Sequence, residues 1–412
     1  MGIVLERESL RQRADFTYKF NAKTGRHGWL RLTPAYSLKI VEDLVISNPE
    51  ARRIFDPFCG TATTALSAAY HGREGVTTDI NPFLIWLGQA KTMHYSTVDI
   101  ELTREVCLDI VEIVKKQNIE PYSLPPLHNI ERWWHQRELN FLQLLKSAIY
   151  KTTEVASAQR RLLMVAFCRT LMKLSNAAFN HQSMSFKNGG QLKMGLEFDL
   201  YETFAADVQF IINSAGENPS GKATILLGDS RNPASVVDGK FDLVITSPPY
   251  ANRMSYIREL RPYMYWLDFL SNGRDAGELD WETIGGTWGI ATSKLTDWER
   301  PTEQFRNEQL LGILDKIANT NNKNGIVLSK YVAKYFDDMW SHFKGLTPIL
   351  APCSEIHYIV GNSTFYGTLV STEQLYAKML KTLGFSNIEC RPIRKRNSKK
   401  ELIEFDVVAR WE

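Results

Sequence analysis

The chain has 412 residues, enough for two or three domains, with 44% hydrophobic and 23% charged residues. This composition excludes an intrinsically disordered protein, and no apolar run approaches the length of a membrane span. The net charge of +3 neither requires nor excludes a nucleic-acid partner, because clustering of basic residues decides that question. Five cysteines without a C-x-x-C pair or zinc-ligand spacing favour a reduced, cytoplasmic protein with no metal. The charged first residues predict no signal peptide.

The predicted elements alternate between strand and helix near both ends of the chain. Residues 37–47 have helical periodicity, with Ser37 as a candidate N-cap, and residues 52–72 and 74–92 each read as strand, loop and helix. Residues 101–216 carry apolar side chains at i, i+3, i+4 spacing, which predicts a helical block. Further strands, a helix and a closing hairpin are predicted at 222–233, 241–250, 354–363, 372–385 and 387–411.

This order predicts an α/β fold with a doubly wound, mostly parallel, Rossmann-like sheet. An antiparallel C-terminal hairpin extends the sheet, and a helical insertion splits it. We therefore expect residues 1–100 and 221–412 to form one domain, with residues 101–220 inserted between its two parts. Trp133, Trp134 and His135, within the insertion, are predicted to open a helix, and we expect the two tryptophans to pack in the core rather than to contact a base.

A rigid lip follows the predicted strand Phe241–Ile245. Pro248 and Pro249 cannot continue a central strand, since neither has an N–H for the ladder, and both fix the backbone in an extended shape. Open α/β sheets bind ligands just past the carboxyl ends of their strands. The lip therefore predicts a binding edge that holds Tyr250 and nearby carbonyls in place. Alternatively, it is a proline turn with Tyr250 capping the core.

Two acidic residues are predicted at other strand ends. Asp79 follows the glycine turn at Gly60 by 19 residues, a spacing that suits a carboxylate binding the hydroxyls of a ribose. Asp229 ends a later strand and could accept from an adenine amino group. The alternatives are a tight turn at Gly60, a helix N-cap at Asp79, which Asn81 could also provide, and a simple turn at Asp229. The loop does not match the G-x-G-x-x-G fingerprint, because Ala62 occupies the position where a second glycine is often seen.

The order of these features resembles the S-adenosylmethionine-dependent amino-methyltransferases of DNA. The segment Ser247-Pro248-Pro249-Tyr250 is similar to the N4-cytosine branch, where adenine enzymes more often carry Asp or Asn before the prolines. Residues 26–45 resemble the family's element at the methionine end of the cofactor, and residues 56–65 resemble its cofactor loop. The resemblance covers most of the chain outside the helical block, whose position between family motifs is unusual.

The resemblance implies transfer of a methyl group to N4 of a flipped cytosine in double-stranded DNA, with restriction-modification as the biology. Ser247, Pro248, Pro249 and Tyr250 are the implied catalytic residues, with Ser247 Oγ and the Pro248 carbonyl as acceptors and Tyr250 stacking on the base. The implied residues for S-adenosylmethionine are Thr33, Pro34, Ala35, Tyr36, Asp56, Pro57, Phe58, Cys59, Gly60, Thr61, Asp79, Ile80, Asn81, Asp229, Ser230 and Thr246. Residues 1–100 would then bind the cofactor and residues 221–412 would carry catalysis.

Clustered basic residues are candidates for DNA contact, although charge runs are usually solvated faces. The candidates are Lys187, Arg253, Arg258, Arg261, Arg394 and Arg396. Target reading is expected from residues 101–220 and from residues 271–323. A cognate restriction endonuclease is a possible partner, and the enzyme is expected in the cytoplasm, on the nucleoid when bound to DNA.

Three alternatives stay open on the sequence. The same lip could serve N6 of adenine, because both substrates are exocyclic amines. An RNA amino-methyltransferase usually adds a recognisable RNA-binding module, and we recognise none in this sequence. An inactive DNA-binding subunit would not need every strand-end residue, yet all of them are present. A covalent route through Cys353 does not fit the strand order, so this cysteine is expected to be structural.

Overall fold

The structure is a computed structural model. It describes residues 10–32, 36–178, 185–186, 199–252, 254–286, 290–396 and 401–412. Five of the residues predicted for the site lie outside the described residues, namely Thr33, Pro34, Ala35, Lys187 and Arg253.

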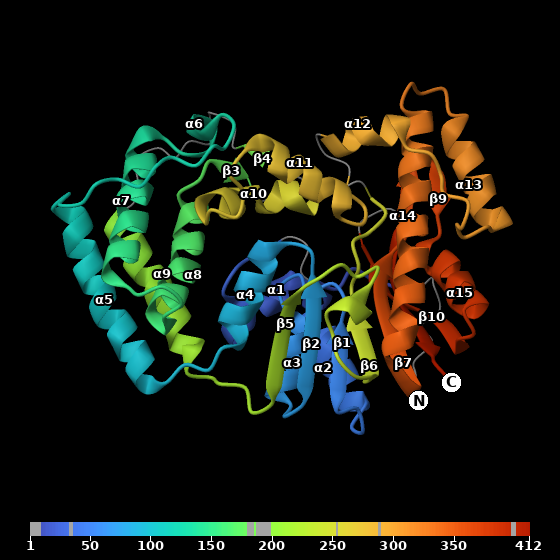
Figure 1. Cartoon of the computed structure of the whole chain (residues 1–412), viewed down its shortest axis with the longest axis horizontal. Helices are drawn as coiled ribbons and strands as arrows, with labels where there is room; N and C mark the ends of the chain where they lie inside the picture. Colours follow the sequence, from blue (N-terminus) through green and yellow to red (C-terminus); the bar gives the residue numbers. More distant parts are fainter. Residues whose placement is uncertain are drawn as a thin grey trace.

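A mixed sheet forms the centre of the molecule (Figure 1). Its strands are β1 (Arg53–Asp56), β2 (Glu74–Asp79), β5 (Lys222–Leu227), β6 (Phe241–Thr246), β7 (Leu350–Gly361), β10 (Ser386–Lys395) and β11 (Ile403–Arg410). Among the described residues these seven pair in the order β10-β11-β7-β6-β1-β2-β5. The pairs from β7 through β5 are parallel, whereas β11 is antiparallel to both β7 and β10. The predicted mostly parallel sheet with an antiparallel hairpin is therefore confirmed.

Helices cover both faces of the sheet. They are α2 (Leu38–Ser47), α3 (Thr63–Tyr70), α4 (Pro82–Thr92), α14 (Gly325–Leu346) and α15 (Thr372–Thr382). On one face, Val41 of α2 and Ala68 of α3 pack against Ile54 and Ile245. On the other face, α14 and α15 bury their apolar sides against β6, β7 and β11. Strands covered on both faces explain why β1 and β6 read as short apolar runs.

The predicted insertion is helical (Figure 1, left). Its helices are α5 (Thr97–Lys115), α6 (Ile130–Trp133), α7 (Gln136–Thr152), α8 (Ala158–Lys173) and α9 (Leu200–Ala215). Trp133 and Trp134 are buried in its core, as predicted. The fully buried Asp207 of α9 accepts from Arg169 and Lys173 of α8 at 2.9 and 2.6 Å. A buried charge is tolerated only when it is paired in this way, so the pair fixes how α8 and α9 pack.

Helix α10 (Tyr256–Trp266) connects the insertion to the sheet domain. Tyr263 stacks on Phe83 of α4 with ring centroids 5.0 Å apart, and Trp266 meets Trp134 edge-on at 5.8 Å. These contacts make one continuous apolar core from α4 through α10 into the insertion. Helix α10 thus holds the insertion against the sheet.

The remaining elements are short or follow α10. Residues 271–323 contain α11 (Gly273–Glu282), α12 (Ile290–Asp297) and α13 (Glu308–Ala318). The other elements are α1 (Tyr18–Asn21), 3₁₀ turns at Ala14–Phe16, Gly25–Gly28, Pro233–Ser235 and Thr347–Ile349, and the small strands β3 (Ala177–Ala178), β4 (Ser185–Phe186), β8 (Ser363–Phe365) and β9 (Thr368–Val370).

Local details differ from the sequence prediction at two helix starts. Ser37 does precede α2, but its hydroxyl donates to the Asp15 carbonyl at 2.9 Å and does not cap the helix. Trp133 ends α6, and His135 is the N-cap residue of α7, so the predicted single helix start at these residues is two elements.

Candidate functional site

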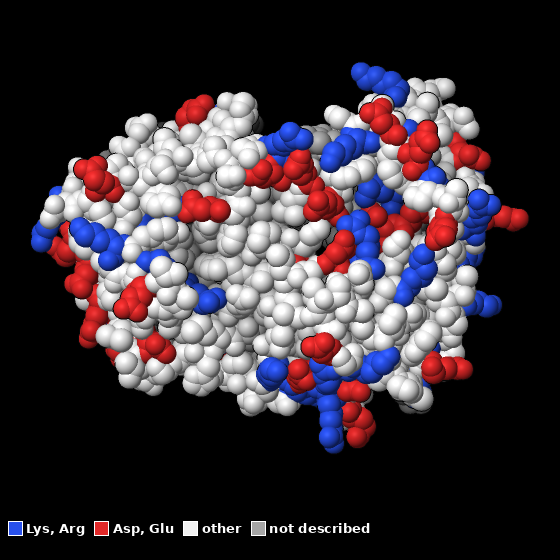
Figure 2. Space-filling view, in the orientation of Figure 1, with Lys and Arg blue, Asp and Glu red and all other residues white. Residues whose placement is uncertain are grey.

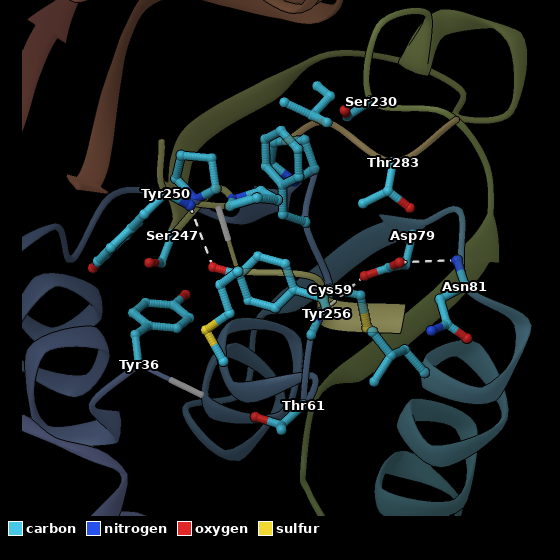
Figure 3. A pocket seen from close by; sticks show the side chains of 18 of the residues that line it. Tyr36, Cys59, Thr61, Asp79, Asn81, Ser230, Ser247, Tyr250, Tyr256 and Thr283 are labelled. Atoms are coloured by element: carbon cyan, nitrogen blue, oxygen red, sulfur yellow. Dashed lines mark hydrogen bonds between the residues drawn. The ribbon is translucent and has the colours of Figure 1, made fainter. Parts of the chain in front are cut away.

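A cavity of about 370 Å³ lies at the carboxyl ends of β1, β2, β5 and β6. β1 lies between β2 and β6, so the chain changes winding direction there, which is where open α/β sheets bind ligands. Figure 3 shows Tyr36, Ser247 and Tyr250 on one side of the cavity and Asp79, Asn81 and Thr283 on the other. The predicted residues that line it are Tyr36, Pro57, Phe58, Cys59, Gly60, Thr61, Asp79, Ile80, Asn81, Asp229, Ser230, Ser247, Pro248, Pro249, Tyr250, Arg394 and Arg396.

The loop after β1 has an unusual backbone. Gly60 and Ala62 both have positive φ, at 49° and 58°. The left-handed region is natural for glycine and strained for alanine. Ala62 therefore takes a conformation that glycine would take without strain. Between these two residues, the Thr61 carbonyl accepts from the buried Lys91.

Lys91 of α4 holds this loop from its buried side. Its fully buried Nζ donates to the Thr61 carbonyl at 3.1 Å and to the His27 carbonyl at 3.3 Å. Burial lowers the pKa of Lys91 to about 7. The two carbonyls are neutral partners, so Lys91 holds the loop and the segment near His27 together through hydrogen bonds.

Asp79 connects the end of β2 to the loop. Its Oδ2 accepts from Gly60 N at 3.1 Å and its Oδ1 accepts from Asn81 N at 2.9 Å. Burial raises the pKa of Asp79 to about 6. Asn81, not Asp79, caps α4, since its Oδ1 accepts from Phe83 N at 3.0 Å. The carboxylate therefore keeps acceptor capacity for a ligand in the cavity it lines.

The turn after β5 is fixed by two side chains. Both carboxylate oxygens of Asp229 accept from Arg231, at 2.7 to 3.0 Å. The ring of His342 lies 2.6 Å from the Ser230 carbonyl through Nδ1 and 2.6 Å from Tyr358 Oη through Nε2. Burial lowers the pKa of His342 to about 4, so its ring is neutral. Since a carbonyl only accepts, Nδ1 carries the proton and Nε2 accepts from the tyrosine.

The lip after β6 has its polar groups pinned. Ser247 Oγ donates to the Ile359 carbonyl of β7 at 2.9 Å. The Pro249 carbonyl accepts from Tyr335 at 2.8 Å, and Tyr250 N donates to Tyr256 Oη at 3.3 Å. Because its single proton is used, Ser247 Oγ can offer only lone pairs to the cavity. Among the described residues, no donor is bonded to the Pro248 carbonyl.

Two predicted cofactor residues lie behind the cavity wall. Asp56 is fully buried, and its Oδ1 accepts from Thr246 Oγ1 at 2.6 Å and from Phe58 N at 3.0 Å. Burial raises the pKa of Asp56 to about 7. Asp56 and Thr246 do not line the cavity. They tie β1 to β6 and hold the turn at Phe58.

The described arginines predicted for DNA contact have intramolecular partners or partial burial. Arg258 of α10 is half-buried. Arg261 lies over the Trp133 ring, 5.4 Å from its centroid, and burial lowers its pKa. Arg394 and Arg396 reach the cavity itself. Both were predicted from their charge as DNA contacts. The prediction missed that Arg394 pairs with Glu404 and that Arg396 lies over the Tyr250 ring.

The sequence reasoning also missed lining residues from other elements. They are Phe16, Thr17, Leu84, Gly228, Asn252, Met254, Tyr256, Ile257, Leu260, Glu282, Thr283, Ile284 and Glu404. Glu404 had a signal, because it is acidic between the buried Ile403 and Phe405 of an apolar strand. Buried carboxylates need partners, so such a residue marks a polar contact.

The surface gives less information than the cavity. On the face shown in Figure 2, Lys and Arg lie interspersed with Asp and Glu, and a wide uncharged area crosses the middle.

In the described part of the chain, no three His, Cys, Asp or Glu side chains are grouped to hold a metal ion. Within that part, too, no helix has the length and hydropathy to cross a membrane. Cys353 is exposed and lies outside the cavity lining.

The chain is similar to type II methyltransferases over most of its length. Type II methyltransferase M.MvaI of Kocuria varians is 23% identical over 372 residues, covering 85% of this chain and 79% of the relative. Type II methyltransferase M.AvaI of Nostoc sp. is 21% identical over 94% of this chain and 85% of the relative. M.BsoBI of Geobacillus stearothermophilus, also a type II methyltransferase, is 21% identical over 99% of this chain and 88% of the relative.

Neither the family models nor the solved structures extend this similarity. No protein-family model matches the chain. The solved structure of TrmN from Thermus thermophilus matches 96% of this chain and 53% of its own chain, at 10% identity and a TM-score of 0.30, too low to compare the folds in detail. The similarity at hand is therefore that to type II methyltransferases, at low identity and high coverage.

Proposed function

We propose that this chain is a type II DNA methyltransferase of a restriction-modification system, which uses S-adenosylmethionine to methylate the exocyclic N4 of cytosine. The observation that carries the proposal is Ser247. Its hydroxyl proton is donated to the Ile359 carbonyl, so its oxygen faces the cavity as an acceptor only. An acceptor fixed beside a second one, the Pro248 carbonyl, suits an amino group that has two hydrogens to donate.

The residues that line the other half of the cavity fit the cofactor. Asp79 offers acceptor oxygens for the two ribose hydroxyls, and the turn at Gly60 lets a ligand approach the backbone. Phe58, Ile80 and Ile284 give apolar walls for an adenine ring. When bound, S-adenosylmethionine supplies an electrophilic methyl group on a positively charged sulfur. Asp229, predicted to meet the adenine amino group, would do so while paired with Arg231.

The remaining work falls to the lip. The amino nitrogen of cytosine is a poor nucleophile, because its lone pair is delocalised into the ring. By accepting hydrogen bonds from its two N–H groups, Ser247 Oγ and the Pro248 carbonyl turn that lone pair out of conjugation and orient it. No strong general base is needed beforehand, since the amino proton becomes acidic as positive charge builds on the nitrogen and would then be released to solvent. The base reaches this pocket by flipping out of the duplex.

Other parts of the chain would read the target. Residues 271–323 contribute Glu282, Thr283 and Ile284 of α11 and its C-terminal turn to the cavity rim, and the insertion at 101–220 joins the rim through α10. We propose that both regions contact duplex DNA, together with Lys187, Arg253 and Arg258.

Methyl transfer to DNA tests the proposal. The protein is incubated with unmethylated plasmid DNA and S-adenosylmethionine that carries a labelled methyl group, and acid-insoluble label is counted. Transfer that is lost in Ser247→Ala, with cofactor binding retained by calorimetry, supports the assignment. Retention of full transfer by Ser247→Ala would remove Ser247 from the reaction, and absence of transfer by the wild-type protein would refute the activity.

A further inference from the structure

The C-terminal hairpin contains a buried ion pair that forms part of the cavity wall. Glu404 of β11 faces Arg394 of β10 in the sheet. Arg394 donates to Glu404 through Nε at 2.7 Å and through Nη2 at 3.0 Å, one bond to each carboxylate oxygen. Only 4% of Glu404 is exposed, and both residues line the cavity. A bidentate pair of this kind holds its carboxylate in one orientation.

Tyr250 of the lip is bonded to this pair. Its hydroxyl donates to Glu404 Oε1 at 2.8 Å. Its backbone N–H is held at the other end by Tyr256. Tyr250 is therefore held at its backbone and at its hydroxyl, and the partner of the hydroxyl lies 154 positions later in the sequence.

Arg396 covers one face of the Tyr250 ring. Its guanidinium lies 4.8 Å from the ring centroid, at cation–π distance, and Nη1 donates to the Asn362 carbonyl at 2.7 Å. A Cβ on Gly361 would lie 2.5 Å from that Nη1, so glycine at the end of β7 leaves the path for Arg396. With this face covered, a base can stack only on the opposite face of the ring.

We propose that Glu404, Arg394 and Arg396 are positioning residues that hold Tyr250 as a fixed stacking wall for the target base. This inference rests on the proposed function. It gives Arg394 and Arg396 a role through Tyr250 in place of the phosphate contacts predicted from their charge. A wall that is already ordered does not have to be ordered when the base arrives, so the hairpin contributes to orientation of the amino group.

The test separates positioning from folding and from phosphate contact. Single-turnover methyl transfer to plasmid DNA is measured for Tyr250→Phe, Glu404→Gln and the double variant, with cofactor affinity by calorimetry alongside. We expect each single variant to transfer about tenfold more slowly at unchanged cofactor affinity, the value of one hydrogen bond to a charged group. We expect the double variant to be no slower than the slower single one, because both changes weaken the same bond.

Tyr95→Phe is the matched control. Its hydroxyl is buried and donates to the Ala90 carbonyl at 2.8 Å, outside the cavity, so its loss costs similar stability. We expect its transfer rate to stay at the wild-type value. Wild-type rates in Tyr250→Phe and Glu404→Gln, or rates that multiply in the double variant, would overturn the proposal while leaving the methyltransferase intact. No transfer by the wild-type protein would instead refute the proposed function.

Arg396→Gln distinguishes the two roles of this arginine. In the positioning role, transfer slows while the salt dependence of DNA affinity is unchanged. In a phosphate-contact role, DNA affinity falls and the slope of log affinity against log salt decreases by about one. The second result would overturn the assignment of Arg396.

Discussion

Replacement of Asp79 by asparagine should weaken cofactor binding strongly. The carboxylate accepts from Gly60 N and Asn81 N through different oxygens. An asparagine keeps one of these oxygens and replaces the other with a donor, so a backbone N–H or a ribose hydroxyl loses its acceptor. A hydrogen bond to a charged group contributes about 1.5 to 3 kcal/mol. That range corresponds to roughly 10- to 150-fold in Kd.

Isothermal calorimetry with S-adenosylmethionine measures this change. Asp242→Asn is the control for the same substitution outside the cavity. Its Oδ2 accepts from two backbone N–H groups, Arg52 N and Arg53 N, both at 2.9 Å. Asp242 lies at the amino end of β6, away from the cavity. The reasoning is refuted if both variants bind with equal affinity, or if Asp79→Asn binds as tightly as the wild type.

The pH dependence of cofactor binding gives a second test at Asp79. Burial raises the pKa of this carboxyl to about 6. Ribose hydroxyls bind its ionised form more strongly, because ionisation leaves both oxygens free to accept. Binding therefore stabilises the ionised form, and affinity should fall as the pH drops through about 6. The same titration on Asp79→Asn should be flat in that range. An equally steep fall in the variant would assign the dependence to another group.

Two further predictions concern the lip and the sheet. Ser247→Ala should lower kcat by about 10²-fold, as expected for one preorganised group, with cofactor affinity unchanged; Ser235→Ala, an exposed serine, should match the wild type. Burial alone would lower the pKa of His357, but Asp406 and Glu355 outweigh it and raise the pKa from 6.5 to about 9. The stability that protonated His357 contributes is complete below about pH 6.5 and is lost as the pH rises through about 9. Melting temperatures of the wild type and His357→Gln should thus converge at high pH; a constant difference would contradict this assignment.

The strand-end residues could be predicted because their positions follow from local sequence. Gly60, Asp79, Asp229 and Ser247 each follow a short apolar run, and parallel strands bring their carboxyl ends to one edge. The cavity at that edge joins all four residues. The pattern also predicted the mixed sheet, since a polar turn between two closing strands requires an antiparallel hairpin.

The contacts of the hairpin could not be predicted in the same way. Glu404 reaches Tyr250 because β11 pairs with β7, which lies beside β6, and this order depends on long-range pairing. Arg261 looked like a basic surface residue but lies over Trp133, across a helix interface. The Ser37 hydroxyl likewise has a partner in the Asp15 carbonyl, which lies among the first 25 residues, where the sequence shows no periodic pattern. Side chains with several possible partners are settled by tertiary structure.

Identifying the methylated nucleoside distinguishes cytosine from adenine as the target base. Plasmid DNA is incubated with the protein and isotopically labelled S-adenosylmethionine, digested to nucleosides and resolved by mass spectrometry. We predict label in N4-methylcytosine, because the segment Ser247-Pro248-Pro249-Tyr250 resembles that of the N4-cytosine branch, whereas the two acceptors alone would serve either amino group. Label in N6-methyladenine would contradict the base assignment while keeping fold and chemistry. Absence of label in DNA, with cofactor binding intact, would contradict DNA methylation itself.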